Sequence, residues 1–541
     1  MMKIIRIIIL SITLALCLNT LLISQEFEIN VDTNITFQKI TGWEATSFII
    51  SQCNPDYNII RDSVIKKAVN EIGTNRIRLE IRSGVENSID YYKIWKDNGC
   101  PSGTDTNYLA WRASRYATVN DNNDTTINWN GFQFTDFDEK IESIVLPMQT
   151  ELLKKGEKLF INVCYVAFTG QIKQGIYIHD NPDEYSEFVL ATYIHMKEKY
   201  NLTPDTWEVV LEPDNVSQWN GTKLGQAIAK SAERLLKNGF KPRFVAPSNT
   251  NMTNAIKYFD DMIKVNGVIE NIEELSYHRY GGVSLQSLTT IADRARQYNI
   301  NTSMLEWWFD NSTFRVLHED LTIGNNSTFQ EAALSGLFDI TKISPGNYSY
   351  KINGITEFNK IYYNLFRPGD IRIMAQANNT KLKPVAFRNK SGMLSFVIIA
   401  DTTGNIKIKQ VLNGNYIISL YNQDFSKRFT TQTSSMNNEL SFSLKNTGLV
   451  SIKQIDSITD VSEQNFSTDF SVYPNPASGI ITIAGFSGNA KIFDIMGCEV
   501  WSGEVKENAK INIEAINSGI YFLKMINLQS GKISILKIVK I

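Results

Sequence analysis

The segment Lys158-Leu-Phe-Ile-Asn-Val-Cys-Tyr-Val166, with the two elements that follow it, decides the fold class of this chain. It is a short apolar run rich in β-branched and aromatic residues, which is typical of a buried strand. An amphipathic stretch with helical spacing follows over residues 184–200, and a second strand-like run covers residues 208–211. Strand, helix and strand in this order predict a βαβ unit, in which the two strands are parallel.

The same alternation extends outward in both directions. It predicts further strands at residues 41–45, 76–81, 243–247, 275–280 and 303–307, with an eighth near 348–352. Helices are expected at residues 63–72, 137–155, 225–238, 285–298 and 328–340. Eight such strands suffice for an α/β fold of the (β/α)8 TIM barrel type over residues 25–360. An open doubly wound sheet is the alternative, but no Gly-rich phosphate loop follows a strand to favour it.

The pattern changes after the barrel. Residues 361–455 contain repeated short strands without a convincing helix, which predicts an all-β sandwich. The early strand at residues 25–40 has no helix after it and either opens the barrel or joins this sandwich. Residues 456–469 have linker composition, and the short strands of residues 470–541 predict a second, small β-sandwich.

The start of the chain predicts a secretory signal peptide over residues 1–24. Lys3 and Arg6 precede an apolar run that ends in small Ser24. A membrane anchor is the alternative, but polar residues interrupt the run and no later apolar stretch of about 20 residues follows, so we expect no transmembrane anchor. Export permits disulfides, and Cys53 and Cys100 could pair, although sequence alone does not fix connectivity.

Composition excludes several classes of function. Lys plus Arg total 54 against 56 Asp plus Glu, a formal charge of −2, so bulk electrostatics do not favour nucleic acid. The four histidines are scattered, and no Cys/His pair has metal-ligand spacing. We therefore expect no metal site and no cofactor.

Two glutamates stand where predicted strands end. Trp207-Glu-Val-Val-Leu-Glu-Pro-Asp-Asn215 places Glu212 before a proline, and Thr302-Ser-Met-Leu-Glu-Trp-Trp-Phe309 places Glu306 at the end of an apolar run. In a barrel, the C-terminal ends of the strands converge on one face, where active sites lie. Apolar surroundings raise the pKa of a carboxyl group and prepare it for acid catalysis. We predict a catalytic pair, against the alternative that each glutamate is solvated or salt-bridged.

Alternation along the strands names the residues beside this pair. In Arg76-Ile-Arg-Leu-Glu-Ile81 the charged residues share one face, so Arg76 and Arg78 can pair with the two glutamates or form a structural ion network. His278 and Tyr280 also share a face, one strand before Glu306. They are expected to orient the nucleophile by hydrogen bonds, and plain core packing is the alternative.

Tryptophans near strand ends suggest a saccharide ligand. Sugar rings present apolar C–H faces, for which indole planes are good platforms. Among four such tryptophans, Trp43 and Trp308 are predicted to be walls of the site, with core packing as the alternative reading of each.

The end of the chain resembles a known export module. Tyr473-Pro-Asn-Pro476, Phe493-Asp-Ile-Met-Gly497, Gly519-Ile-Tyr-Phe522 and Lys537-Ile-Val-Lys540 resemble the C-terminal type A sorting domain of the type IX secretion system. The resemblance implies recognition by that secretion machinery, passage across an outer membrane, and release or surface attachment. A generic terminal binding sandwich is the alternative.

The middle of the chain resembles retaining glycoside hydrolases of clan A, particularly the family 30 or glucosylceramidase-like group. Phe37-Gln-Lys-Ile-Thr-Gly-Trp-Glu-Ala45 and Gly73-Thr-Asn-Arg-Ile-Arg78 resemble their first two strands, and Tyr362-Tyr-Asn-Leu-Phe-Arg-Pro-Gly-Asp-Ile-Arg372 resembles their passage into the sandwich. The resemblance implies that Glu212 is the acid/base and Glu306 the nucleophile. It also implies that Arg78 supports the nucleophile and that His278 and Tyr280 belong to strand six.

One position departs from that family. The clan normally has Asn directly before the acid/base, where it binds the sugar 2-hydroxyl, but this chain has Leu211. The contact is either lost or moved to another polar residue, such as Asn162 or Asn215.

The sequence therefore supports an exported retaining glycosidase acting on a β-linked oligo- or polysaccharide. A non-catalytic glycan-binding or adhesion protein on the same barrel is the alternative that Leu211 motivates. A purely structural surface protein is the third, and it predicts neither binding nor turnover.

Overall fold

The computed structural model describes residues 26–119, 126–308, 313–422, 428–455, 471–494, 499–526 and 533–541. The predicted signal peptide at residues 1–24 and the linker at residues 456–469 lie outside the described residues. The chain divides into two compact units, Met1–Ser457 and Ile458–Ile541.

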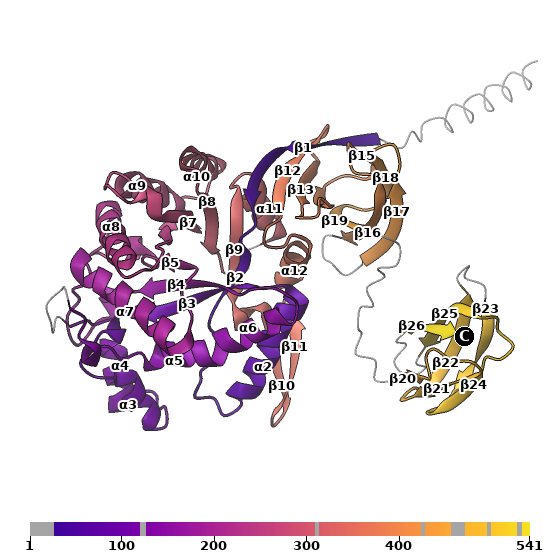
Figure 1. Ribbon diagram of the computed structural model, residues 1–541, viewed down its shortest axis with the longest axis horizontal. Helices are drawn as coiled ribbons and strands as arrows, with labels where there is room; N and C mark the ends of the chain where they lie inside the picture. Colours follow the sequence, from indigo (N-terminus) through magenta and orange to yellow (C-terminus); the bar gives the residue numbers. More distant parts are fainter. Residues whose placement is uncertain are drawn as a thin grey trace, which may run out of the picture. The chain divides into compact units, whose positions relative to one another are not determined.

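A closed barrel of parallel strands forms the centre of the first unit (Figure 1). The predicted TIM barrel is confirmed, because every strand pairs in parallel with the next and the last pairs with the first. Buried side chains fill the space between the strands and the surrounding helices. The strands are β2 (Gly42–Thr46), β3 (Arg76–Arg82), β4 (Phe160–Val166), β5 (Thr206–Glu208), β6 (Phe244–Asn251), β7 (Ile272–Gly281), β8 (Asn301–Glu306) and β9 (Asn326–Ala333).

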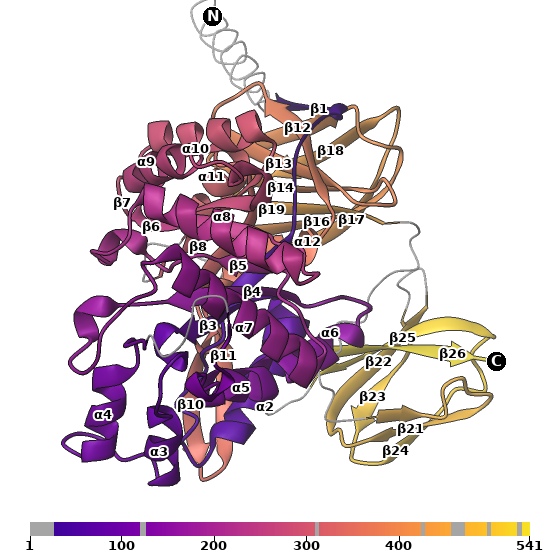
Figure 2. The ribbon, with the colours of Figure 1, turned by 60° about the vertical axis from the view of Figure 1, so that its left-hand side comes forward.

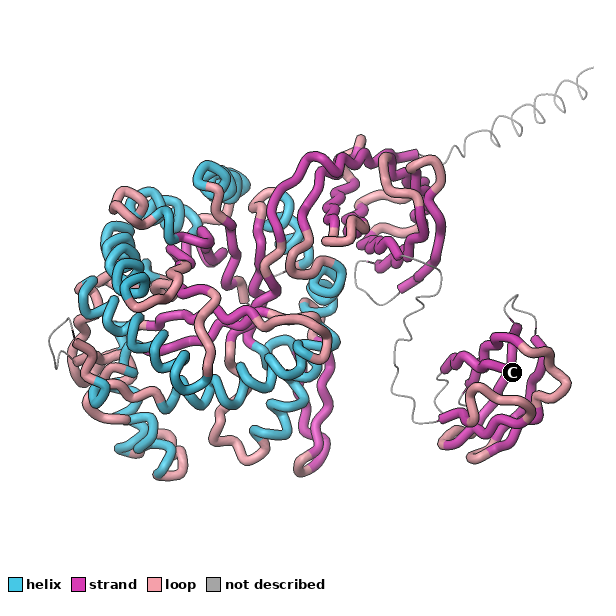
Figure 3. The backbone as a smooth tube through the Cα atoms, in the orientation of Figure 1, coloured by secondary structure: helices cyan, strands magenta, loops and turns pink. Residues whose placement is uncertain are grey.

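Helices cover the outside of the barrel, as the tube in Figure 3 shows by colour. Local signals set their ends: α7 begins after Asn181, whose side chain caps the Asp183 N–H, and it ends at left-handed Asn201. The helices that follow barrel strands are α2 (Tyr57–Lys67), α5 (Thr135–Lys140), α6 (Leu146–Leu153), α7 (Pro182–Tyr200), α8 (Gly221–Lys237), α9 (Met252–Met262), α10 (Leu285–Tyr298), α11 (Phe314–Thr322) and α12 (Thr356–Leu365).

The eighth barrel strand was assigned wrongly from the sequence. The helix expected at residues 328–340 is instead β9, followed by β10 (Phe338–Ser344). The strand expected near residues 348–352 is β11 (Asn347–Ile352), which pairs only with β10 in a hairpin outside the barrel. A strand buried on both faces carries no alternation, so its periodicity cannot be told from that of a buried helix.

A nine-stranded sheet forms the predicted sandwich beside the barrel. The first strand, β1 (Glu26–Lys39), pairs with β12 and β15, so the start of the described chain belongs to this sheet and not to the barrel. The other strands are β12 (Ile371–Ala377), β13 (Leu382–Arg388), β14 (Leu394–Ala400), β15 (Gly404–Lys409), β16 (Gly414–Asn422), β17 (Arg428–Ser435), β18 (Glu439–Leu444) and β19 (Gly448–Ile455).

The second unit is a small all-β domain, shown in yellow in Figure 2. A three-stranded and a four-stranded sheet enclose its own apolar core, as predicted. Its strands are β20 (Ser471–Tyr473), β21 (Ile480–Ala484), β22 (Gly488–Asp494), β23 (Glu499–Val505), β24 (Ala509–Asn512), β25 (Gly519–Ile526) and β26 (Ile533–Lys540).

An insert after β3 carries two short helices, α3 (Tyr91–Asp97) and α4 (Thr106–Ser114). The disulfide between Cys53 and Cys100, which the sequence left open, ties this insert to the loop after β2. Among the residues that the structure describes, no helix combines the length and the apolar character needed to cross a bilayer.

Candidate active site

The two predicted catalytic glutamates meet at the C-terminal end of the barrel. Glu306 is the last residue of β8, and Glu212 lies just after β5. One carboxylate oxygen of each, together with one ring nitrogen of His278, lie within 4.8 Å of one another. Residues 94 positions apart in the sequence are therefore brought face to face by the closure of the barrel.

Glu306 is held by two donors. The Arg78 guanidinium donates from Nη2 to Oε2 at 2.6 Å, and the Tyr280 hydroxyl donates to Oε1 at 2.9 Å. Burial and the charge of Glu306 raise the pKa of Tyr280, so the phenol keeps its proton and remains a donor. Charge-assisted bonds of this kind favour the ionised carboxylate and fix its orientation.

Glu212 occupies a strained turn. Its φ of +51° is left-handed, a conformation that a non-glycine residue adopts only when its surroundings impose it. Pro213 follows, and the Glu212 N–H donates to the Ser248 carbonyl at 3.1 Å. Asp214 ties the same turn to the end of β6, because its carboxylate accepts from the N–H and the hydroxyl of Thr250, both at 2.9 Å.

The Glu212 carboxylate has two side-chain partners. His278 Nδ1 lies 3.2 Å from Oε1, and the Asn215 amide donates to Oε2 at 3.0 Å. Burial alone would raise the pKa of Glu212, but the hydrogen bond and charge of His278 and the Asn215 amide outweigh it and leave the pKa below its usual value. The sequence-based expectation of a raised pKa for this acid is therefore wrong.

Tyr280 and His278, which were both expected beside the nucleophile candidate, contact different glutamates. Tyr280 contacts Glu306 as expected, whereas His278 contacts Glu212 instead of the nucleophile candidate. Arg76 does not reach either glutamate: it bonds Glu44 and Glu274 deep in the barrel, the structural network that was the alternative.

The structure brings one of the two predicted tryptophan walls to the site. The Trp308 ring lies 6.0 Å from the Arg78 guanidinium, and neighbouring Trp307 lies 5.6 Å from Tyr280. Trp43 is fully buried and faces away from the barrel interior: its ring stacks on Tyr363 of α12 and its Nε1 donates to a backbone carbonyl. It packs the helical layer and has no face open to a ligand.

Sequence reasoning missed the residues that shape Glu212. Asn215 was named only as a possible substitute contact and Asp214 was not named, because both follow the strand in a turn whose geometry no pattern announces. Asn162, the other possible substitute, is fully buried and bonds Glu208 and Thr206, so it does not reach the surface. Leu211 is 5% exposed and packs with Tyr116.

The arrangement can do acid–base and nucleophilic chemistry between two carboxylates. In retaining glycosidases the two carboxyl groups are about 5–5.5 Å apart, and in inverting enzymes about 6.5–9.5 Å apart. Here one oxygen of each carboxylate lies within 4.8 Å of the other. The same three groups, Glu212, His278 and Glu306, are also the ones whose donor atoms are close enough to hold a cation, although such an ion would compete with Arg78 for Glu306.

Comparison with known families identifies the second unit. Residues 471–540 match the model of the secretion system C-terminal sorting domain. This domain directs the protein through type IX secretion to the cell surface or outside the cell. Comparison of the whole sequence with curated proteins gives no match.

Solved structures resemble the first unit in fold. A GH30 endoxylanase from Clostridium papyrosolvens is 16% identical, with a TM-score of 0.55 over 79% of this chain and 100% of that one. The catalytic domain of GH30 xylanase C from Talaromyces cellulolyticus is 12% identical, with a TM-score of 0.53 over the same shares. An endo-β1,6-glucanase is 13% identical, with a TM-score of 0.54 over 80% of this chain and 94% of that one. The barrel and sandwich thus have the fold of family 30 glycoside hydrolases.

Proposed function

We propose that this protein is an exported retaining glycoside hydrolase that cleaves a β-linked glycan by double displacement. The observation that carries the proposal is the approach of Glu212 and Glu306 to within 4.8 Å at the C-terminal end of the barrel. A barrel of this fold places its chemistry at that end. This approach of the nearest oxygens is closer than the about 6.5–9.5 Å of inverting enzymes, and it supports the retaining mechanism.

In the first step, the ionised Glu306 carboxylate attacks the anomeric carbon. Glu212, in its protonated form, gives its proton to the glycosidic oxygen as the bond to the leaving sugar breaks. Arg78 and Tyr280 donate to the two oxygens of Glu306 and aim its carboxylate, which is the support that a carboxylate nucleophile needs. The product of this step is a glycosyl ester on Glu306.

In the second step, Glu212 acts as a base. It takes a proton from water, whose oxygen attacks the anomeric carbon and releases Glu306. Two displacements at one carbon return the original anomeric configuration. The lowered pKa of Glu212 in the free protein keeps this carboxylate ionised for the second step, and it means that the first step is favoured as the pH falls.

The direct test replaces the nucleophile and traps the ester. Glu306→Gln should abolish hydrolysis across a polysaccharide panel while leaving the unfolding curve unchanged. A 2-fluoro glycoside of any accepted sugar should label the wild-type protein on Glu306. Glu270→Gln is the matched control, because Glu270 is exposed just before β7, at the N-terminal end of the barrel strands and away from the two glutamates. Wild-type activity in Glu306→Gln would rule the assignment out.

Leu211 favours one second candidate, a glycan-binding protein without turnover. It replaces a polar contact next to the acid/base with a buried apolar side chain. This candidate predicts measurable glycan binding, no labelling by the fluoro glycoside and no hydrolysis.

A further inference from the structure

The insert after β3 forms a rigid surface next to the proposed active site. Arg82 ends β3 on the same face as Arg78, four residues further on, or about 13 Å along an extended strand. Helix α3 is tied down by the Cys53–Cys100 disulfide, and its Trp95 stacks on Trp111 of α4 with ring centres 4.5 Å apart. A surface built in this way keeps its shape before any ligand arrives.

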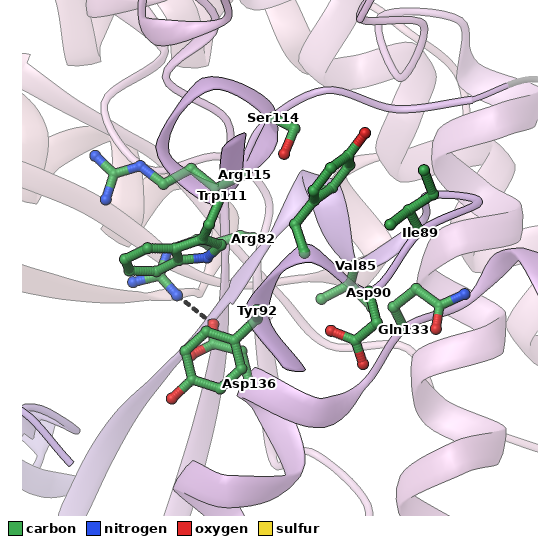
Figure 4. A pocket seen from close by; sticks show the side chains of 12 residues that line it. Arg82, Val85, Ile89, Asp90, Tyr92, Trp111, Ser114, Arg115, Gln133 and Asp136 are labelled. Carbon is green, nitrogen blue, oxygen red and sulfur yellow. Dashed lines mark hydrogen bonds and ion pairs between the residues drawn. The ribbon is translucent and has the colours of Figure 1, made fainter. Parts of the chain in front are cut away.

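Two arginines lie over Trp111, the half-buried member of this aromatic stack. The guanidinium of Arg82 lies 5.9 Å from the Trp111 ring centre, and that of Arg115 lies 5.8 Å from it. Figure 4 shows the three side chains together at one wall of a small pocket. The pocket holds only about 30 Å³, room for one or two waters, so a sugar ring cannot enter it and must lie against its wall.

Two arginines, Arg82 and Arg115, and two aspartates, Asp90 and Asp136, line this pocket. Arg82 is paired with Asp136, but the same carboxylate also accepts from Lys140 at 3.1 Å. The other carboxylate of the pocket, Asp90, caps the first turn of α3 and accepts from the Thr135 hydroxyl. Among the described residues, neither Asp136 nor Asp90 forms an ion pair with Arg115.

Arg115 is the cation without a counter-charge. Within the part of the chain that the structure describes, no carboxylate pairs with it; its Nη2 donates to the neutral Gln171 amide at 2.5 Å, and its buried Nε has no partner. Burial lowers the pKa of Arg115, and the charges of Arg82 and Arg112 act in the same direction. A bound anion would supply the counter-charge that Arg115 lacks.

We propose that Arg115, with Arg82 and Trp111, forms an outlying subsite for a sugar unit that carries a carboxylate or a sulfate ester. The Arg115 guanidinium binds the anionic substituent, and Trp111, which packs against Trp95 and both arginines, holds the guanidinium groups in place. The inference rests on the proposed function for the reaction and adds the substrate class: a β-linked glycan with acidic substituents.

The test compares acidic and neutral forms of one glycan backbone. A uronate-bearing polysaccharide is paired with its carboxyl-reduced form, and a sulfated one with its desulfated form. The ratio of kcat/KM for the acidic form to that for the neutral form should fall about tenfold or more in Arg115→Gln, the loss expected for a charge-assisted hydrogen bond. The pair that responds identifies which anion is bound.

Arg112→Gln is the matched control. Arg112 is exposed on α4 and lies over Tyr108. Its substitution therefore removes the same charge from the same insert without changing a contact of Trp111. Its kcat/KM ratio should stay within about twofold of the wild-type value. Equal ratios in wild type, Arg115→Gln and Arg112→Gln would overturn the subsite while leaving hydrolysis established.

Binding separates this proposal from the proposed function. In the Glu306→Gln background, Arg115→Gln should weaken binding of the responding acidic polysaccharide about tenfold, measured by affinity electrophoresis at low and high salt. If this loss occurs in a protein whose wild type hydrolyses nothing, the subsite stands and the glycosidase assignment falls. If neither acidic polysaccharide binds better than its neutral form, the subsite is refuted.

Discussion

A buried carboxyl group between the barrel and α12 should make the fold sensitive to pH. Glu331 on β9 is 3% exposed and accepts from the Thr356 hydroxyl at 2.6 Å and the Asn359 amide at 2.5 Å. Burial raises its pKa from 4.5 to about 7, and these two hydrogen bonds offset only part of the rise. Because the folded state holds this proton more tightly than the unfolded chain, its contribution is fully present below about pH 4.5 and is lost as pH rises through 7.

The size of the effect follows from the shift. A rise from 4.5 to about 7 corresponds to about 3 kcal/mol at about 1.4 kcal/mol for each pKa unit. Glu331→Gln keeps the shape and removes the charge. The Asn359 amide oxygen has no partner among the described residues, so a flip of that amide lets the new glutamine donate to it. The variant should match wild type near pH 4.5 and exceed it by about 3 kcal/mol at pH 8.

Urea unfolding of the full chain between pH 4.5 and 8.5, followed by tryptophan fluorescence, measures this difference. Trp43 packs against Tyr363 of the same helix and therefore reports on this region. Glu357→Gln removes a charge from the solvent-facing side of α12, where it pairs with Lys360, and its difference from wild type should change by less than about 0.5 kcal/mol over the range. Parallel pH curves for Glu331→Gln and wild type would refute the reasoning.

Two further predictions concern the site and its insert. His278→Ala removes the partner that lowers the pKa of Glu212, so the alkaline limb of the kcat/KM profile should move to higher pH. Tyr280→Phe acts on Glu306 and should leave that limb in place. An unmoved limb in His278→Ala would contradict the assignment of Glu212 as the acid. Replacing both Cys53 and Cys100 by Ser opens a loop with a sequence separation of 47 residues. On the chain-entropy model this should lower the free energy of unfolding by up to about 4 kcal/mol, measured as a lower urea midpoint. An unchanged midpoint would show that the insert holds its shape without the disulfide.

The sequence contained enough to locate the two glutamates but not their partners. Each acid follows a short apolar run, and the rule that barrel chemistry lies at strand ends then places both at one mouth. Which of them His278 contacts depends on the register between β7 and β8, which shifts between Tyr277 and His278. No pattern along a single strand carries that shift, so the reversal of the expected Glu212 pKa was equally hidden.

The position of Trp43 could be predicted from the alternation of faces along β2. Glu44 bonds Arg76 inside the barrel, so alternation along β2 turns Trp43 outward to the helices. A charged residue between apolar neighbours on a barrel strand is the signal that decides the faces. β9 offered a weaker signal, because its one charged residue, Glu331, follows the polar Gln330 and does not stand between two apolar neighbours.

The departure at Leu211 and the subsite proposed at Arg115 trace to adjacent residues of one insert. Leu211 packs with Cys164, Val166 and Tyr116, and Tyr116 directly follows Arg115 at the end of α4. A polar side chain at position 211 would be enclosed by this apolar cluster without a partner, at a cost of about 1–3 kcal/mol. The insert that excludes a polar contact beside the acid/base therefore also supplies the unpaired cation. We therefore infer that polar recognition of the proposed glycan comes from this insert and not from position 211 after β5.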